Sequence, residues 1–189
     1  MINLRTLLPI NFAIMVLVSI VNTAYGQMPA DTQFVQDIRD HKYADTMAYL
    51  VNGGTPNARD YNDIPAIVAA ASVGDAGMVK ELLKYGAIPD LAVKGTGMTA
   101  LMQGAMRGDV MVIAVLATSG ATLDLPDDLG ETALIKAVKE GRRTIVRHLL
   151  DAGADPELTD YSGYSAYDHA QRSRDNQIRA YLKRAVSAR

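Results

Sequence analysis

Hydrophobic and polar positions repeat along this chain in a fixed order. Three segments of 23 residues align without a gap: they read PAIVAAASVGDAGMVKELLKYGA (65–87), TALMQGAMRGDVMVIAVLATSGA (99–121) and TALIKAVKEGRRTIVRHLLDAGA (132–154). Each segment carries two apolar stripes with helical spacing, and a glycine follows each stripe. In the third segment the stripes are formed by Leu134, Ile135, Val138, Ile145, Val146, Leu149 and Leu150. The pattern therefore predicts two short helices in every segment.

Helices of this length need neighbours. A helix of two or three turns is unstable alone in water, so each must bury its apolar stripe against another helix. Gly74, Gly108 and Gly141 lie 34 and 33 residues apart, so one unit comprises two helices and a connecting turn. Units of such a period bury their stripes by stacking on one another. We expect an all-α solenoid.

The repeated segment resembles the ankyrin-repeat family. The matching features are the T-x-L-x-x-A start, the glycine between the helices, the V-x-x-L-L run and the Gly-Ala that follows. The turn before the first helix, called the fingertip, fits the D-x-x-G pattern at Asp127–Gly130 and Asp160–Gly163, and in part at Asp60–Asp63 and Lys94–Gly97. The T-P-L-H motif is altered in every unit, and none keeps its histidine. The resemblance implies an all-α ankyrin-repeat solenoid of stacked helix-turn-helix units with β-turn fingertips.

The resemblance covers nearly all of residues 27–189 and implies five units. We expect an N-terminal cap and a C-terminal cap because nothing stacks on the outer side of a terminal repeat, which therefore needs a polar face. The expected units are 30–57 (N-terminal cap), 58–91, 92–124, 125–157 and 158–189 (C-terminal cap).

The N-terminal residues 1–26 have the pattern of a secretory signal peptide. A short, positively charged start precedes an almost wholly apolar run over 12–21, and Ala24-Tyr25-Gly26 supplies small residues where a signal peptidase cuts. The alternative is a retained membrane anchor, but a span needs roughly 20 apolar residues. We expect cleavage after Gly26 and a periplasmic or secreted protein, with no membrane contact after cleavage.

Composition narrows the function classes further. The chain has 19 Lys and Arg against 21 Asp and Glu, a net charge of −2, which becomes −3 when Arg5 is removed with the signal. This balance gives no support to a nucleic-acid partner, which would favour a basic face. The chain has no cysteine, so disulfides, cysteine nucleophiles and a lipid-modified cysteine are excluded.

The loop GTGMTALMQGAMRGD (95–109) resembles a dinucleotide fingerprint, because Gly95, Gly97 and Ala100 fit G-x-G-x-x-G/A. Such a fingerprint needs a βαβ unit and a parallel sheet. The equivalent segments of the other units have the same alignment but are not as rich in glycine. We therefore interpret the loop as a fingertip with an extra glycine and expect no cofactor.

Catalytic and metal-binding patterns are weak. Ser165 begins like a nucleophile elbow, but Tyr167 replaces the second glycine, so a helix N-cap is the better interpretation. His41, His148 and His169 show no metal-ligand spacing. We expect no catalytic residue and no metal site.

The resemblance places partner contacts on the concave face, at the fingertips and late in each inner helix. The fingertip candidates are Tyr61, Asn62, Ile64, Thr96, Met98, Leu129, Glu131, Tyr161 and Tyr164. The inner-helix candidates are Met106, Arg107, Lys139, Glu140 and Arg172, with Arg39, Asp40, Ser72 and Val73 at the same positions in the earlier units. Apolar and aromatic tips are typical of interfaces, although packing between neighbouring tips is an alternative. Met102 is expected in the core.

We therefore predict a non-enzymatic, monomeric protein-binding module that is exported and holds one partner protein. An immunity or inhibitor protein against a toxin effector and an accessory protein for an exported enzyme both fit. The alternatives are a small-ligand binder or enzyme that uses the concave groove, and a secreted effector that acts on a host.

Overall fold

The computed structural model describes residues 28–173 and 175–187. Within these ranges the chain forms ten α-helices and no strand beyond two isolated β-bridges, Arg59 with Pro65 and Thr159 with Ser165. The predicted signal peptide, 1–26, lies outside the described residues. The helices are α2 (Ala30–Arg39), α3 (Tyr43–Val51), α4 (Ala66–Val73), α5 (Ala76–Lys84), α6 (Ala100–Arg107), α7 (Val110–Thr118), α8 (Ala133–Lys139), α9 (Arg143–Asp151), α10 (Ala166–Arg172) and α11 (Asn176–Ser187).

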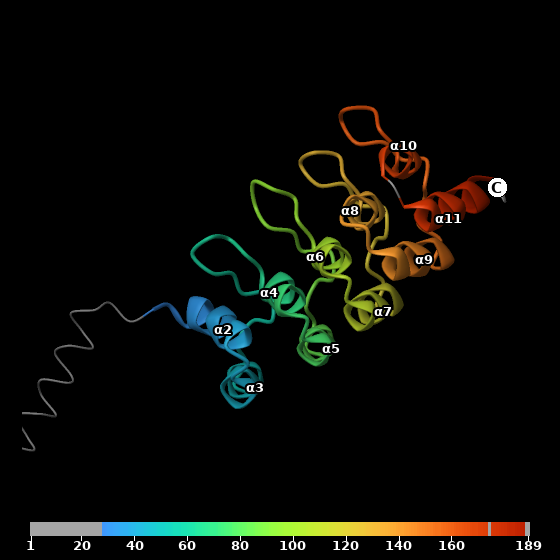
Figure 1. The fold of residues 1–189 in the computed structure, drawn as a ribbon. Helices are drawn as coiled ribbons and strands as arrows, with labels where there is room; N and C mark the ends of the chain where they lie inside the picture. The colour runs from blue at the N-terminus through green and yellow to red at the C-terminus, as the bar shows by residue number, and fades with distance from the viewer. Residues whose placement is uncertain (1–27, 174, 188–189) are drawn as a thin grey trace, which may run out of the picture. The chain divides into compact units, whose positions relative to one another are not determined.

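Residues 31–187 form two layers of helices (Figure 1). The inner row contains α2, α4, α6, α8 and α10, and the outer row contains α3, α5, α7, α9 and α11. Each inner helix from α4 onward packs on the next inner helix and on the outer helix that follows it in sequence. The loops that precede α4, α6, α8 and α10 all project on the same side. The prediction of an all-α helical repeat solenoid is confirmed.

Polar caps explain where the inner helices begin. The Thr99 and Thr132 hydroxyls accept the backbone N–H groups of Met102 and Ile135, each at 3.3 Å. The Ser165 hydroxyl accepts the Asp168 N–H at 3.2 Å, which confirms Ser165 as an N-cap. These hydrogen bonds satisfy N–H groups that the first turn of a helix leaves without a partner.

The core lies between the two layers. Its largest fully buried side chains include Leu101 and Met102 from α6, Leu134 and Ile135 from α8, and Ile145 from α9. The expectation that Met102 belongs to the core is confirmed. These side chains come from both faces of the inner helices and from the inward face of the outer helices, so each unit shares its core with its neighbours.

The second fingertip is one residue longer than the others. The backbone bond at its base joins Val93 N to Met98 O, five residues later, at 2.9 Å. In the other three units the bond spans four residues, as from Asp127 N to Glu131 O at 3.1 Å. The extra residue accounts for the 34-residue spacing between Gly74 and Gly108.

Neighbouring fingertips are joined in two different ways. The third is tied to the second by a bond from Asp128 N to Thr96 O at 3.1 Å, and the fourth to the third by a bond from Tyr161 N to Leu129 O at 3.0 Å. In the described part of the chain, no such backbone bond joins the first fingertip to the second. There the Arg59 guanidinium bridges the two loops, because it donates to the Asp63 and Ala92 carbonyl oxygens at 2.6 and 2.9 Å.

Two glycines of the second fingertip should tolerate alanine differently. Gly95 has φ +76 and open space around its Cβ position, so Gly95→Ala is expected to cost about 1 kcal/mol of stability. Gly97 has φ +68, and a Cβ there would lie 2.8 Å from Asp128 N and 2.9 Å from Asp127 Cα. Gly97→Ala is therefore expected to cost about 2 kcal/mol more stability than Gly95→Ala, which serves as its control. Urea unfolding of both variants tests this, and equal midpoints would contradict the tight packing of these two fingertips.

Candidate functional site

An aspartate at the start of three fingertips fixes the shape of each loop. One carboxylate oxygen of each accepts the backbone N–H groups of the residues two and four positions later, in the manner of Asx turns. The distances are 2.8 and 3.0 Å for Asp60, 2.9 and 2.8 Å for Asp127, and 2.9 and 3.0 Å for Asp160. The loops are thus held in one conformation before any partner arrives.

The other oxygen of each aspartate meets a basic side chain of an inner helix. Asp60 pairs with Arg39 of α2, Asp127 with Lys136 of α8 and Asp160 with His169 of α10, each at 2.7 Å. Lys136 and His169 occupy the same position of their units, nine residues after the aspartate. Although no unit has the histidine of T-P-L-H, these side chains provide the contact between helix and loop.

The pKa values of these aspartates reflect two opposing effects. Burial alone would raise the pKa of Asp127, but hydrogen bonds from Lys136 and from the Glu131 and Leu129 N–H groups outweigh it and hold the pKa below its usual value. The same balance lowers the pKa of Asp60 and of Asp160. Burial would lower the pKa of Lys136, but its hydrogen bonds to Asp127 and Glu131 raise it. The pair of Asp127 with Lys136 therefore stays charged.

The structure differs from the expectation for Glu131. It is only 6% exposed, and its carboxylate pairs with Lys136 at 2.8 Å and also with Lys139. Two lysines of α8 thus neutralise Asp127 and Glu131, the two buried acids of the third fingertip. Glu131 is a structural residue, and its carboxylate faces the protein where we expected a partner contact.

The second fingertip lacks this arrangement, and a groove lies beside it. Lys94 stands where the others have aspartate, the Thr96 hydroxyl accepts the Met98 N–H at 3.3 Å, and Gln103 takes the position of Lys136. A groove of about 300 Å³ lies between the first two fingertips and the inner helices. It is lined by Ile64, Val68, Val93 and Met98, and by the polar Arg39, Ser72, Thr96 and Gln103.

The structure brings part of the predicted contact set together at this groove. Ile64, Thr96 and Met98 line it, as do Arg39 and Ser72 of the wider set. Val68 and Val93 were missed, because apolar residues on an inner helix or loop are ordinarily core, and Gln103 was missed as well. Gln103 could have been found from its alignment with Lys136 and His169.

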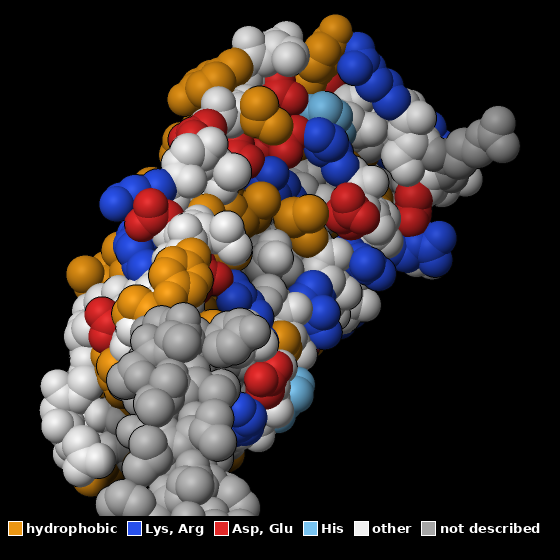
Figure 2. Space-filling model, turned by 90° about the vertical axis from the view of Figure 1, so that its left-hand side faces the viewer, with side chains coloured by type: hydrophobic (Ala, Val, Ile, Leu, Met, Phe, Trp, Pro, Cys, Tyr) orange, Lys and Arg blue, Asp and Glu red, His pale blue; other side chains and the backbone are white. Residues whose placement is uncertain are grey.

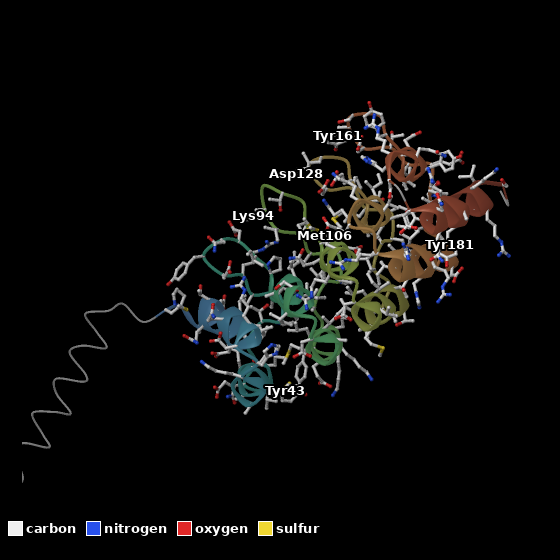
Figure 3. All side chains as sticks on the ribbon, in the orientation of Figure 1. Tyr43, Lys94, Met106, Asp128, Tyr161 and Tyr181 are labelled. Atoms are coloured by element: carbon white, nitrogen blue, oxygen red, sulfur yellow. The ribbon has the colours of Figure 1, made fainter. Side chains whose placement is uncertain are left out.

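The other predicted residues are spread over the inner face, by which we mean the surface formed by the fingertips and the inner helices. Tyr61, Leu129 and Tyr161 are 68%, 62% and 77% exposed on three different fingertips. Lys94, Asp128 and Tyr161 mark successive loops on the same side (Figure 3). Hydrophobic side chains alternate with charged ones over that side (Figure 2). Five further predicted residues are exposed as well: Asn62, Arg107, Lys139, Glu140 and Arg172. Met106 is half-buried.

In the last unit two predicted residues pack against each other. The Arg172 guanidinium lies 3.8 Å from the centre of the Tyr164 ring, and the His169 ring meets Tyr164 edge-on at 5.9 Å. Tyr164 is therefore ordered without a partner, which lowers the entropic cost of a contact at this end of the inner face.

Neither a metal site nor a membrane span emerges from the described residues. They contain no group of three or more His, Asp or Glu side chains placed to hold a metal ion. None of their helices combines the length and the apolar character that crossing a bilayer requires.

Comparison with known proteins decides the family. A family model described as ankyrin repeats in three copies matches residues 37–127, 66–160 and 101–185. The chain belongs to the ankyrin-repeat family. Ankyrin repeats are in general non-enzymatic modules of protein–protein interaction, so the fingertips and inner helices are where a protein partner is expected.

Several curated proteins are similar to this ankyrin-repeat chain. The mouse ankyrin repeat and SAM domain-containing protein 6 is 33% identical over 132 residues, which cover 68% of this chain and 15% of that protein. A putative ankyrin repeat-containing protein of Treponema pallidum (strain Nichols) is 28% identical over 141 residues, 75% of this chain and 47% of that protein. Mouse diacylglycerol kinase iota is 33% identical over 122 residues, 62% of this chain and 11% of the kinase. The chain thus spans less than half the length of each of these relatives.

Proposed function

We propose that this chain is an exported, non-enzymatic and monomeric module that binds one partner protein through its inner face. The observation that carries the proposal is the groove of about 300 Å³ beside the second fingertip. Here an apolar floor and polar edges occur together, beside the first fingertip with its exposed Tyr61.

The lining of the groove suits an inserted side chain. Ile64 and Met98 are half-buried and pack on the core, so they offer apolar area at little cost in ordering. Methionine adapts to differently shaped partners because its side chain is unbranched and polarisable. Thr96 and Gln103 supply hydrogen-bonding groups at the edge, which can fix the orientation of a bound segment.

Exposed fingertip side chains support a broader contact over the inner face. Tyr61 and Tyr161 are large, exposed side chains on loops whose backbones are fixed by buried aspartates. Tyrosine and methionine are enriched among the residues that dominate binding energy. An exposed set of this kind has little benefit for a solenoid without a partner.

Export is supported by the signal-peptide pattern of residues 1–26. Two biological roles suit an exported binding module: an immunity or inhibitor protein that blocks a toxin effector, and an accessory protein that stabilises an exported enzyme. The identity of the captured partner discriminates between the two roles.

The test is affinity capture of the exported protein with its partner from the periplasmic fraction of its native host, followed by mass spectrometry. A variant with Tyr61, Met98 and Tyr161 changed together to Ala should retain less than about a tenth of the partner, a loss above 1.4 kcal/mol of binding energy. Its matched control changes Tyr43, Val51 and Tyr85, three exposed side chains outside the inner face, to Ala.

If the two variants captured equal amounts of partner, the inner-face proposal would be wrong. Mass spectrometry of the purified protein also identifies its N-terminal residue, which we expect to be Gln27. An N-terminus at Met1 would show that the signal is retained.

A further inference from the structure

The outer helix α7 has no polar face. Its sequence, VMVIAVLAT, contains no charged residue. Val112, Ile113 and Leu116 are buried against the rest of the protein, yet the opposite side is also apolar: Met111 is 63% exposed and Ala114 is exposed. A surface helix normally places polar residues there, and a helix that is apolar all round is normally buried.

The neighbouring outer helices carry charge at the matching positions. Met111, Ala114 and Thr118 correspond by alignment to Gly77, Lys80 and Lys84 of α5. They correspond equally to Thr144, Arg147 and Asp151 of α9. Since α5 and α9 both pack beside α7, the apolar strip lies between basic side chains.

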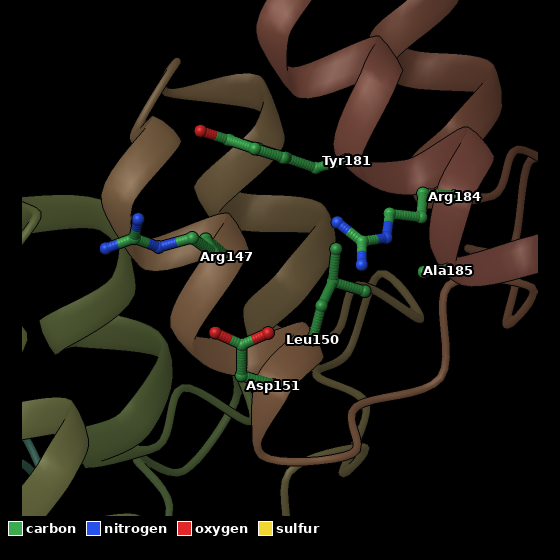
Figure 4. Close-up of a pocket in the computed structure, with 6 residues that line it drawn as sticks. All are labelled: Arg147, Leu150, Asp151, Tyr181, Arg184 and Ala185. Atoms are coloured by element: carbon green, nitrogen blue, oxygen red, sulfur yellow. The ribbon is translucent and has the colours of Figure 1, made fainter. Parts of the chain in front are cut away.

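A pocket of about 300 Å³ lies farther along the same surface, between α9 and α11. Arg147 of α9 and Arg184 of α11 stand on opposite sides of Leu150, with Tyr181 across the opening and Asp151 at its edge (Figure 4). In the described part of the chain, no hydrogen bond or ion pair joins either guanidinium to another side chain. The pocket thus presents two guanidinium groups that form no ion pair with a described side chain, and one carboxylate, Asp151.

We infer that the outer face over α7, α9 and α11 is a second docking surface, for a protein segment that presents an apolar side chain beside carboxylates. The apolar group packs on Met111 and Ala114, and a carboxylate enters between Arg147 and Arg184. Guanidinium groups bind carboxylates through paired hydrogen bonds, and charge complementarity of this kind selects the partner. This surface is separate from the inner face and does not depend on what binds there.

Two other occupants fit this surface less well. A second copy of this chain docked by a two-fold axis would place Lys80 and Arg147 against the same basic side chains of its mate. A membrane would gain little apolar contact, because Met111 is the single large apolar side chain that α7 exposes.

The experiment is selection of a displayed library of random peptides on the purified exported protein, followed by affinity measurements on variants. We expect enriched peptides with Asp or Glu beside a large apolar residue. Their binding should weaken at least about tenfold in Met111→Asp, and equally in the double variant Arg147→Glu with Arg184→Glu. The matched controls are Val51→Asp, which is equally exposed on α3, and Lys183→Glu on α11, and both should bind as the parent does.

Four results would overturn this inference. The first is a selection in which no enriched peptide is sensitive to Met111→Asp and to the arginine double variant. The second is enrichment of basic peptides. The third is cosedimentation with phosphatidylglycerol vesicles that Met111→Asp abolishes, and the fourth is a dimer in sedimentation equilibrium that the same variant dissociates.

The variant with Tyr61, Met98 and Tyr161 changed to Ala should still bind the outer-face peptides. Failure of the inner-face proposal would therefore leave this one standing, and the reverse also holds.

Discussion

Lys136→Met is expected to lower the free energy of unfolding by about 3 to 5 kcal/mol, because it leaves two buried carboxylates without their shared cation. The Lys136 side chain is 7% exposed and lies 2.7 Å from Asp127 and 2.8 Å from Glu131. Methionine keeps most of the apolar stem, so the change removes charge with little loss of packing. Urea unfolding followed by far-UV circular dichroism gives the measurement.

Lys139→Met is the matched control, since the Lys139 side chain is 44% exposed and pairs with the same Glu131. A partly exposed pair is worth about 1 kcal/mol or less. Adding Asp127→Asn and Glu131→Gln to Lys136→Met should recover part of the loss, because no uncompensated charge remains. If Lys136→Met were no more destabilising than Lys139→Met, the cluster would not contribute to stability as we infer.

Leu134→Ala is the second substitution with a large expected effect, a loss of about 3 kcal/mol. Leu134 is fully buried in α8, an inner helix that packs on both α6 and α10. Leu129→Ala makes the same chemical change on the third fingertip, where the side chain is 62% exposed, and should cost about 0.5 kcal/mol or less. Thermal and urea unfolding of the pair provide the test, and similar losses would mean that Leu129 is packed in solution.

Leu129→Ala also has a use in binding experiments. Because the side chain is a proposed partner contact that does not support the fold, reduced capture by this variant would report lost contact area and not a weakened solenoid.

Local patterns were sufficient to predict the fold. Thr132 and Ser165 cap their helices because capping depends only on residues within one turn, and apolar spacing identifies the buried face of an amphipathic helix such as α9. Glu131 shows where this approach fails. Its position on a fingertip was predictable, but its burial depends on Lys136 and Lys139 lying on the side of α8 that faces the loop, and single-position alignment does not reveal such a cluster.

The groove was harder to anticipate for a related reason. The extra residue near Gly95 was visible in the sequence as a change of spacing, and we interpreted the loop as a fingertip with an extra glycine. Its consequence, an opening lined by Val68 and Gln103, follows from the missing backbone bond between two loops that are about 30 residues apart. The apolar α7 was equally visible, but only the packing of its neighbours shows that one side stays uncovered.

The Arg59 bridge gives the solenoid unequal mechanical compliance. The second, third and fourth fingertips are tied by short backbone bonds, so they should respond to a partner as one rigid body. The first is held to the second by a guanidinium at the end of a long side chain and by the exposed pair of Lys94 with Asp63 at 3.2 Å. Such links can lengthen without unfolding a loop. The groove therefore lies at the junction between the first and second fingertips, which can widen more easily than the other two junctions. Its opening can thus adjust to the side chain that enters.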